Sequence, residues 1–73
     1  MTWNYRVIKH TTDDVIYYGI HEVYYDDKQE PSSYSEDSIA PYGQTLEEIK
    51  SDLEKMVTAL SKPVLDVKIF HKD

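Results

Sequence analysis

The sequence predicts an α+β fold in which a three-stranded antiparallel β-sheet is packed by one amphipathic C-terminal helix. Three observations predict it. Two segments of alternating residues open the chain, a polar segment follows a proline-containing turn, and a capping box then begins a helical apolar repeat. Because the strands form a run before the helix, the sheet is expected to be an antiparallel meander with short connections.

The first two strands are expected at residues 3–10 and 15–25. In both segments, aromatic and β-branched residues recur with a period of two, and a polar Thr-Thr-Asp-Asp turn separates them. The second segment is apolar on both faces, which indicates the central strand of the sheet. Gly19 in its middle indicates either a bulge or a close approach by another group.

Two further strands are predicted from weaker patterns. Residues 32–39 follow Pro31, which cannot donate a ladder hydrogen bond, and their serines and acids are typical of an exposed edge. Near the C-terminus, apolar and polar residues alternate over residues 65–70, which makes a fourth strand possible in principle.

The helix has the clearest signals. Thr45 and Glu48 form a capping box, in which the threonine hydroxyl accepts from the amide three residues on and the glutamate reaches back. Pro63 is expected to end the helix near Ser61. The apolar positions recur at helical spacing and form one stripe: Leu46, Ile49, Leu53, Met56, Val57 and Leu60.

Length and composition limit the function classes. A chain of 73 residues forms a single domain, 1–73. It has no cysteine, which excludes disulfides and thiolate metal sites and fits a cytoplasmic protein. Its 14 acidic residues outnumber 8 basic ones, giving a net charge of −6 that opposes binding to a nucleic-acid backbone. No apolar run is long enough to span a membrane.

The sequence has no motif that supports catalysis. The paired carboxylates at residues 13–14, 26–27 and 36–37 lie in turns or at an edge, where they are solvated, whereas glycosidase-type catalysis needs one desolvated carboxyl group. No GxSxG nucleophile elbow occurs, and a chain with 2 glycines has no glycine-rich phosphate loop. We therefore expect a protein that is not an enzyme and has no cofactor.

One alternative is a metal-dependent activity. His10 and His21 could face each other across the first hairpin, with Glu22 beside them. Two imidazoles and a carboxylate are a known zinc ligand set. No HExxH or comparable spacing supports this site, so ordinary polar histidines are the preferred interpretation.

Charge and tyrosine distribution favour a protein-binding surface. Residues 22–42 contain six acids and one base, a net charge of −5, so most of the net charge lies in this segment. All seven tyrosines precede residue 43, and several lie within the acidic segment. Core packing is the preferred interpretation for Tyr17, Tyr18 and either Tyr24 or Tyr25, whereas Tyr34 and Tyr42 are expected to be exposed. Tyrosine combines a large rigid area with a hydroxyl and is enriched at protein interfaces. The expected contact residues are Tyr24, Tyr25, Tyr34, Glu36, Asp37 and Tyr42.

We therefore expect a non-catalytic protein-interaction module. Its protein partner is unknown, and a basic protein would complement the acidic surface. We expect a monomer, because the charges of Glu36 and Asp37 oppose pairing of the edge strand with a second copy. A homodimer formed through the C-terminal strand is the alternative.

Two resemblances accompany this interpretation. Residues 3–7 with His10, 19–26, 40–43 with 45–48, and 62–66 resemble a group of small bacterial proteins of unassigned function, which implies no mechanism. The β-β-β-α order, with Gly-Gln-Thr-Leu-Glu-Glu opening the helix, is similar to the N-terminal domain of HicB-type antitoxins. That resemblance implies an alternative function, neutralisation of a small basic nuclease.

Overall fold

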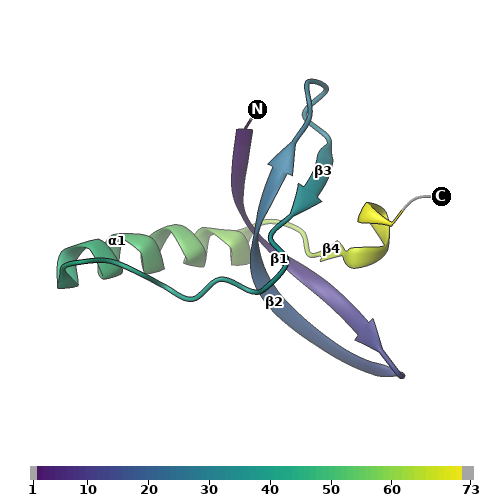
Figure 1. Ribbon diagram of the computed structural model, residues 1–73, viewed down its shortest axis with the longest axis horizontal. Coiled ribbons are helices and arrows are strands. Elements are labelled where there is room, and N and C mark those ends of the chain that lie inside the picture. The colour runs from purple at the N-terminus through teal and green to yellow at the C-terminus, as the bar shows by residue number, and fades with distance from the viewer. Residues whose placement is uncertain (1, 72–73) are drawn as a thin grey trace.

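A computed structural model describes residues 2–71 and confirms the α+β class. Three antiparallel strands precede one helix, and a short fourth strand follows it (Figure 1). The elements are β1 (Thr2–Thr12), β2 (Val15–Tyr25), β3 (Pro31–Tyr34), α1 (Leu46–Val57), the 3₁₀ helix η1 (Thr58–Ser61), β4 (Leu65–Asp66) and the 3₁₀ helix η2 (Val67–Phe70).

The sheet has the order β3-β2-β1-β4, so the strands with the strongest sequence signals are central. β1 and β2 pair along their whole length, from Thr2 opposite Tyr25 to Thr12 opposite Val15. The two residues that connect them, at positions 13 and 14, both have positive φ angles, of 51° and 67°. A two-residue turn of this kind matches the right-handed twist of its strands and makes a tight hairpin.

Gly19 lies in regular pairing opposite Ile8, so the bulge considered at this position is absent from the β1–β2 ladder as the structure describes it. The close approach is present. A Cβ atom added at Gly19 would lie 3.1 Å from the Nε2 atom of His21 and 3.2 Å from the Cβ atom of Ser38. Glycine therefore makes room for the histidine and for the chain that follows β3.

β3 is shorter than predicted, since it begins at Pro31 and ends at Tyr34. The register shifts where Tyr24 and Tyr25 meet this strand, and beyond Tyr34 the chain keeps isolated hydrogen bonds to β2. The Ser35 hydroxyl donates to the carbonyl oxygen of Asp37 at 3.0 Å, which turns the backbone away from a ladder.

β4 is also short, because its second residue caps a 3₁₀ turn. The Asp66 carboxylate accepts from the Lys68 amide at 3.0 Å, so the segment predicted as a strand over residues 65–70 curls into η2 after two residues. β4 pairs parallel to β1, with Ile8 opposite Leu65.

Apolar side chains pack on both faces of the curled sheet. On one face, Tyr5 and Val7 of β1 pack with Met56 and Ala59 from the C-terminal end of the helix, and Ile20 and Ile39 pack against this cluster. Ile8 and Val23, which alternate with the first group along their strands, are fully buried.

The helix begins as predicted. Thr45 Oγ1 accepts from the Glu48 amide at 3.1 Å, while the Glu48 carboxylate accepts from the Gln44 amide at 3.0 Å rather than from Thr45. α1 ends at Val57, and η1 continues the helical path to Ser61. Within residues 2–71, no helix is long and apolar enough to cross a membrane.

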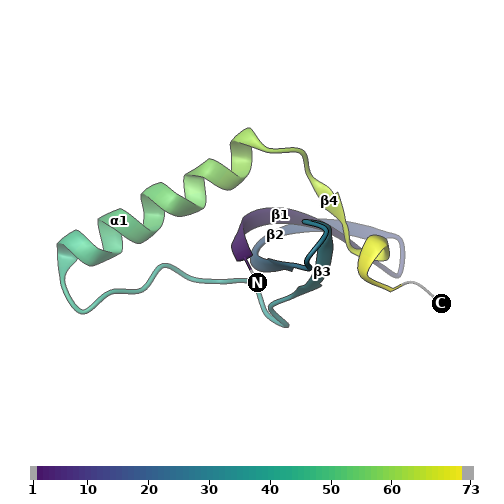
Figure 2. The ribbon, with the colours of Figure 1, turned by 90° about the horizontal axis from the view of Figure 1, so that it is seen from above.

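The helix contacts the sheet mainly through its C-terminal end, and its other end extends away from the sheet (Figure 2). Among the residues of α1, all of which are described, Met56 is the one that is buried. Most of the predicted apolar stripe is therefore exposed. Side chains of α1, of the sheet and of the chain before α1 line an open hollow.

Candidate functional site

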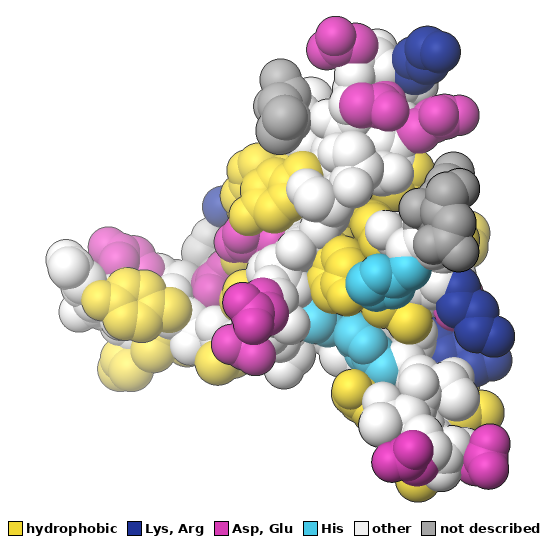
Figure 3. All heavy atoms as spheres, turned by 45° about the vertical axis from the view of Figure 1, so that its right-hand side comes forward, with side chains coloured by type: hydrophobic (Ala, Val, Ile, Leu, Met, Phe, Trp, Pro, Cys, Tyr) yellow, Lys and Arg dark blue, Asp and Glu magenta, His cyan; other side chains and the backbone are white. Residues whose placement is uncertain are grey.

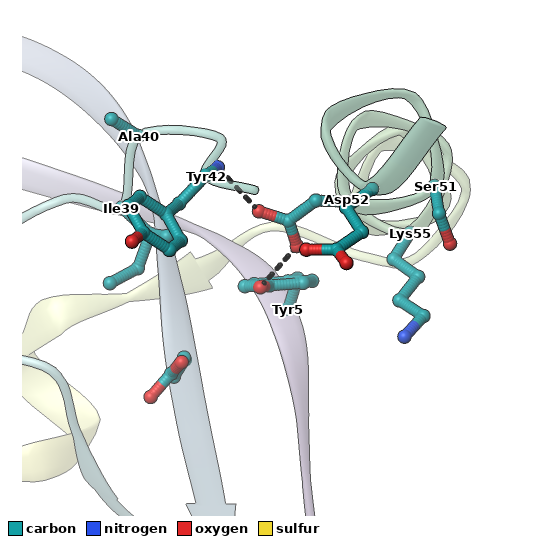
Figure 4. Close-up of a pocket in the computed structure, with 9 residues that line it drawn as sticks. Tyr5, Ile39, Ala40, Tyr42, Ser51, Asp52 and Lys55 are labelled. Carbon is teal, nitrogen blue, oxygen red and sulfur yellow. Dashed lines mark hydrogen bonds between the residues drawn. The ribbon is translucent and has the colours of Figure 1, made fainter. Parts of the chain in front are cut away.

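Asp52 of α1 forms hydrogen bonds to the sheet and to the chain that precedes the helix. This carboxylate accepts from the Tyr5 hydroxyl at 2.8 Å through one oxygen and from the Tyr42 amide at 3.0 Å through the other. Tyr5 comes from β1, Asp52 from α1 and Tyr42 from the connection between β3 and α1 (Figure 4). One side chain thus ties three segments together.

These contacts shift the pKa values of both partners. Burial of Tyr5, followed by its hydrogen bond to Asp52 and by the negative charges of Asp52 and Glu22, raises the pKa of its hydroxyl to about 12. The Tyr42 amide and then the Tyr5 hydroxyl hold the pKa of Asp52 below its usual value. At neutral pH the site therefore keeps a neutral phenol and a carboxylate.

Around this tether lies an acidic groove of about 450 Å³. Three carboxylates and one lysine are among its lining residues, and two tyrosines contribute aromatic rings. The lining residues, all described by the structure, are Tyr5, Glu22, Ile39, Ala40, Tyr42, Glu48, Ser51, Asp52 and Lys55. We call this hollow the acidic groove.

Two of the predicted contact residues belong to this side of the sheet. Tyr42 lines the acidic groove and has 73% of its surface exposed. Tyr24 is half-buried and donates its hydroxyl proton to Glu22, a groove residue, which raises the pKa of the Tyr24 hydroxyl. Tyr42 is thus available to a partner, and Tyr24 positions a carboxylate.

Two other predicted contact tyrosines serve the opposite side of the sheet. Tyr25 accepts from Arg6 Nη1 at 3.0 Å and donates to Asn4 Oδ1 at 2.8 Å. Tyr34 packs against Phe70 with ring centroids 4.7 Å apart. Both side chains are half-buried in intramolecular contacts. This packing agrees with the core role considered for Tyr25, whereas Tyr34 was expected to be exposed. Tyr17 and Tyr18, for which core packing was expected, are instead 49% and 61% exposed.

The remaining predicted contacts, Glu36 and Asp37, are exposed in the segment after β3. They line a second cavity of about 240 Å³ together with His10 and His21. Figure 3 shows histidine side chains near the centre of the molecule, with acidic side chains beside them as well as toward the ends of the view. The six predicted residues are thus divided between two faces of the sheet instead of forming one patch.

The two histidines contact each other directly. His21 is 3% exposed, and its Nδ1 lies 2.9 Å from the carbonyl oxygen of Ser35, so Nδ1 carries the proton. In the neutral pair, His21 Nε2 then accepts from His10 Nε2 at 3.0 Å. Burial and the neighbouring His21 lower the pKa of His10. His10 also stacks on Tyr17, with ring centroids 4.8 Å apart.

The geometry does not assemble the three-ligand set considered for zinc. Glu22 follows His21 in β2 and lines the acidic groove, whereas the histidines line the second cavity on the other face. Within residues 2–71, no three His, Cys, Asp or Glu side chains are grouped so that they could hold a metal ion. The hydrogen bond between the Nε2 atoms occupies the nitrogens that a shared metal would need.

Tyr5, Asp52, Glu48 and Lys55 are site residues that the sequence patterns did not predict. Tyr5 and Asp52 are 47 positions apart, and Asp52 looks like any polar residue on the solvent side of an amphipathic helix. Only the tertiary arrangement brings them together. Helical spacing is the one sequence signal that could have identified Asp52. It lies four residues before Met56, about one helical turn, and therefore on the same side of α1 as this buried residue.

No family model matches the chain, and the comparisons with curated proteins and with solved structures find no significant match.

Proposed function

We propose that this domain is a non-catalytic, cytoplasmic protein-interaction module whose acidic groove binds a basic segment of another polypeptide. The observation that carries the proposal is the convergence of Glu22, Glu48 and Asp52 on one open hollow lined by a single lysine among its described residues. Carboxylates are the natural acceptors for Arg and Lys side chains.

The groove has features of a binding surface besides its charge. Tyr42 is 73% exposed at its edge and offers a rigid aromatic face to an aliphatic or guanidinium group. Ile39 and Ala40 add an apolar floor next to the charged wall. A polar rim with an aromatic anchor is the usual anatomy of a polypeptide interface.

The net charge supports the same partner chemistry. The chain carries a net charge of −6. A negative field speeds encounter with cationic partners and repels anionic ones such as nucleic acids. A small basic nuclease, the partner implied by the antitoxin resemblance, is one member of this class, and the groove supports the class as a whole.

A peptide titration tests the groove. The probe is a blocked hexa-arginine peptide, followed by amide NMR shifts and by calorimetry. We expect the largest shifts at Tyr42, Ser51 and Asp52, with affinity that falls as salt rises, since screening weakens exposed charge pairs.

Matched charge variants distinguish binding in the acidic groove from attraction by the overall negative charge of the protein. Glu22→Gln/Glu48→Gln removes two groove charges, and glutamine can retain the capping interaction of Glu48. Asp13→Asn/Asp27→Asn removes two charges from turns outside the groove lining, and asparagine tolerates the positive φ of Asp13. We expect the groove variant to weaken binding at least about tenfold, which is about 1.4 kcal/mol, and the turn variant to have a much smaller effect. Equal losses would contradict the proposal.

A further inference from the structure

The exposed side of α1, together with that of the 3₁₀ helix η1 that continues it and contains Leu60, presents an apolar strip that the fold leaves uncovered. Leu46, Val57 and Leu60 are 86%, 61% and 69% exposed, and Leu53 between them is 44% exposed. In helical projection these residues share one stripe with the half-buried Ile49. The strip lies on a different flank of the helix from Ser51, Asp52 and Lys55, which line the acidic groove.

The molecule exposes more surface than a compact monomer of its size. Its accessible surface is 5659 Å², whereas a compact monomer of 8.6 kDa is expected to expose about 4,700 Å². Its radius of gyration is 13.2 Å, against about 11 Å for a compact domain of this length. The excess of about 1,000 Å² belongs to the whole molecule, including the β1–β2 hairpin and the acidic groove as well as the strip. It is larger than the roughly 800 Å² that one partner contributes to a standard interface, so the fold leaves room for one such interface.

The strip is self-complementary in its spacing. Its residues are Leu46, Ile49, Leu53, Val57 and Leu60, which lie at offsets of −7, −4, 0, +4 and +7 from Leu53. If a second copy of the helix packs antiparallel with Leu53 facing Leu53, then Leu46 faces Leu60 and Ile49 faces Val57. This symmetry is what a two-fold interface requires, because the same patch must fit itself.

The helix also needs a partner for its own stability. α1 has 12 residues and buries one of them in the described fold. An isolated helix of this length is marginal in water, and helices in proteins are stabilised mainly by packing of their apolar face. An antiparallel neighbour would cover that face and would also place the two helix dipoles in a favourable orientation.

From these observations we infer that the chain forms a two-fold symmetric homodimer through an antiparallel pair of α1 helices centred on Leu53. This interface differs from the edge-strand pairing considered from the sequence, and the charges of Glu36 and Asp37 do not bear on it. It also leaves the acidic groove of each copy open. The inference is independent of the proposed function, since it uses another flank of the helix.

Light scattering after size exclusion measures the dimer directly. At about 100 μM we expect a mass near twice the monomer's 8.6 kDa, with dissociation on dilution. Because two copies of charge −6 repel each other, added salt should strengthen the dimer, whereas it should weaken peptide binding in the groove. A wild-type protein that stays monomeric at about 500 μM overturns the homodimer and leaves the groove proposal intact.

Charge pairing at the two-fold axis tests the register. Leu53→Glu alone and Leu53→Lys alone should each be monomeric, because like charges would meet at the axis. An equimolar mixture of the two variants should form a heterodimer, because the introduced carboxylate of one copy would then face the introduced ammonium group of the other.

Two controls accompany the pair. Ile16→Glu and Ile16→Lys alter a residue of the hairpin that is 52% exposed, and both should remain dimeric. Amide NMR spectra of β1 and β2 verify that each variant is folded. A dimer that persists in Leu53→Glu, or a mixture that stays monomeric while both variants are folded, overturns the α1 interface.

Discussion

At the scale of single residues, Asp52 does most to shape the acidic groove. It accepts one hydrogen bond from Tyr5 at 2.8 Å and one from the Tyr42 amide at 3.0 Å, so both of its oxygens hold the groove walls together. A partner bound in the groove therefore meets a carboxylate that is already oriented. The preferred charge state is also fixed, since the same two donors lower the pKa of Asp52.

The Tyr5→Phe variant tests this tether. Loss of the hydroxyl removes one of the two donors, so the pKa of Asp52 should rise toward its ordinary value of 3.8. A carboxylate with a lowered folded-state pKa contributes stability above its unfolded pKa, and this contribution is lost as pH falls through the folded value. Tyr5→Phe should therefore shift this acid-induced loss of stability to higher pH. Carbon-13 NMR of the Asp52 carboxyl measures the change.

Tyr42→Phe is the matched control for Tyr5→Phe. Tyr42 contributes its backbone amide to Asp52, and this donor survives the substitution. The pKa of Asp52 should therefore be the same as in the wild type. If Tyr5→Phe also left that pKa unchanged, the hydroxyl would have no part in orienting the carboxylate.

At the scale of elements, local signals predicted the structure where they were strong. The period-two pattern predicted residues 15–25 as the strand that is observed at Val15–Tyr25, and the capping box placed the start of α1. β3 and β4 are shorter than predicted because Ser35 and Asp66 bond nearby backbone groups, a competition that a period-two pattern does not reveal. The angle at which the helix leaves the sheet depends on tertiary contacts and has no local signal.

The Thr45→Ala variant tests whether the N-terminal end of α1 can unfold while the rest of the domain stays folded. Removing the hydroxyl deprives the Glu48 amide of its acceptor, at a typical cost of about 1 kcal/mol. Since α1 packs on the sheet near Met56, we expect local fraying of its first turns rather than global unfolding. Hydrogen exchange of the Ile49 and Lys50 amides should accelerate about fivefold, with little change in β1. Thr45→Ser retains the cap and should match the wild type.

At the scale of the whole molecule, one curled sheet separates two chemically different faces. The helix side carries the acidic groove, and the other side carries the pair of His10 and His21 beneath the chain that follows β3. In the inferred homodimer two acidic grooves would belong to one particle, so a partner with two basic segments would gain avidity without any new contact. The acidic segment 22–42 therefore does not form one charged patch, because the fold divides its residues between the two faces.

The histidine pair should make the stability of the whole molecule depend on pH. Burial and the neighbouring His21 lower the pKa of His10 from 6.5, so between the folded and unfolded pKa values the unfolded chain binds more protons. Stability from this group is fully present above about pH 6.5 and is lost as pH falls through the folded pKa of His10. Urea unfolding at pH 7 and pH 5 measures this loss.

The His10→Gln variant isolates the contribution of His10. The glutamine amide can donate to His21 Nε2, as His10 does at 3.0 Å, and it does not titrate. The variant should therefore lose less stability than the wild type between pH 7 and pH 5. The other charges of the protein are unchanged, so the general decrease in negative charge toward the pI of about 4.8 affects both proteins alike. An equal pH dependence in the two proteins would show that protonation of His10 is not linked to folding.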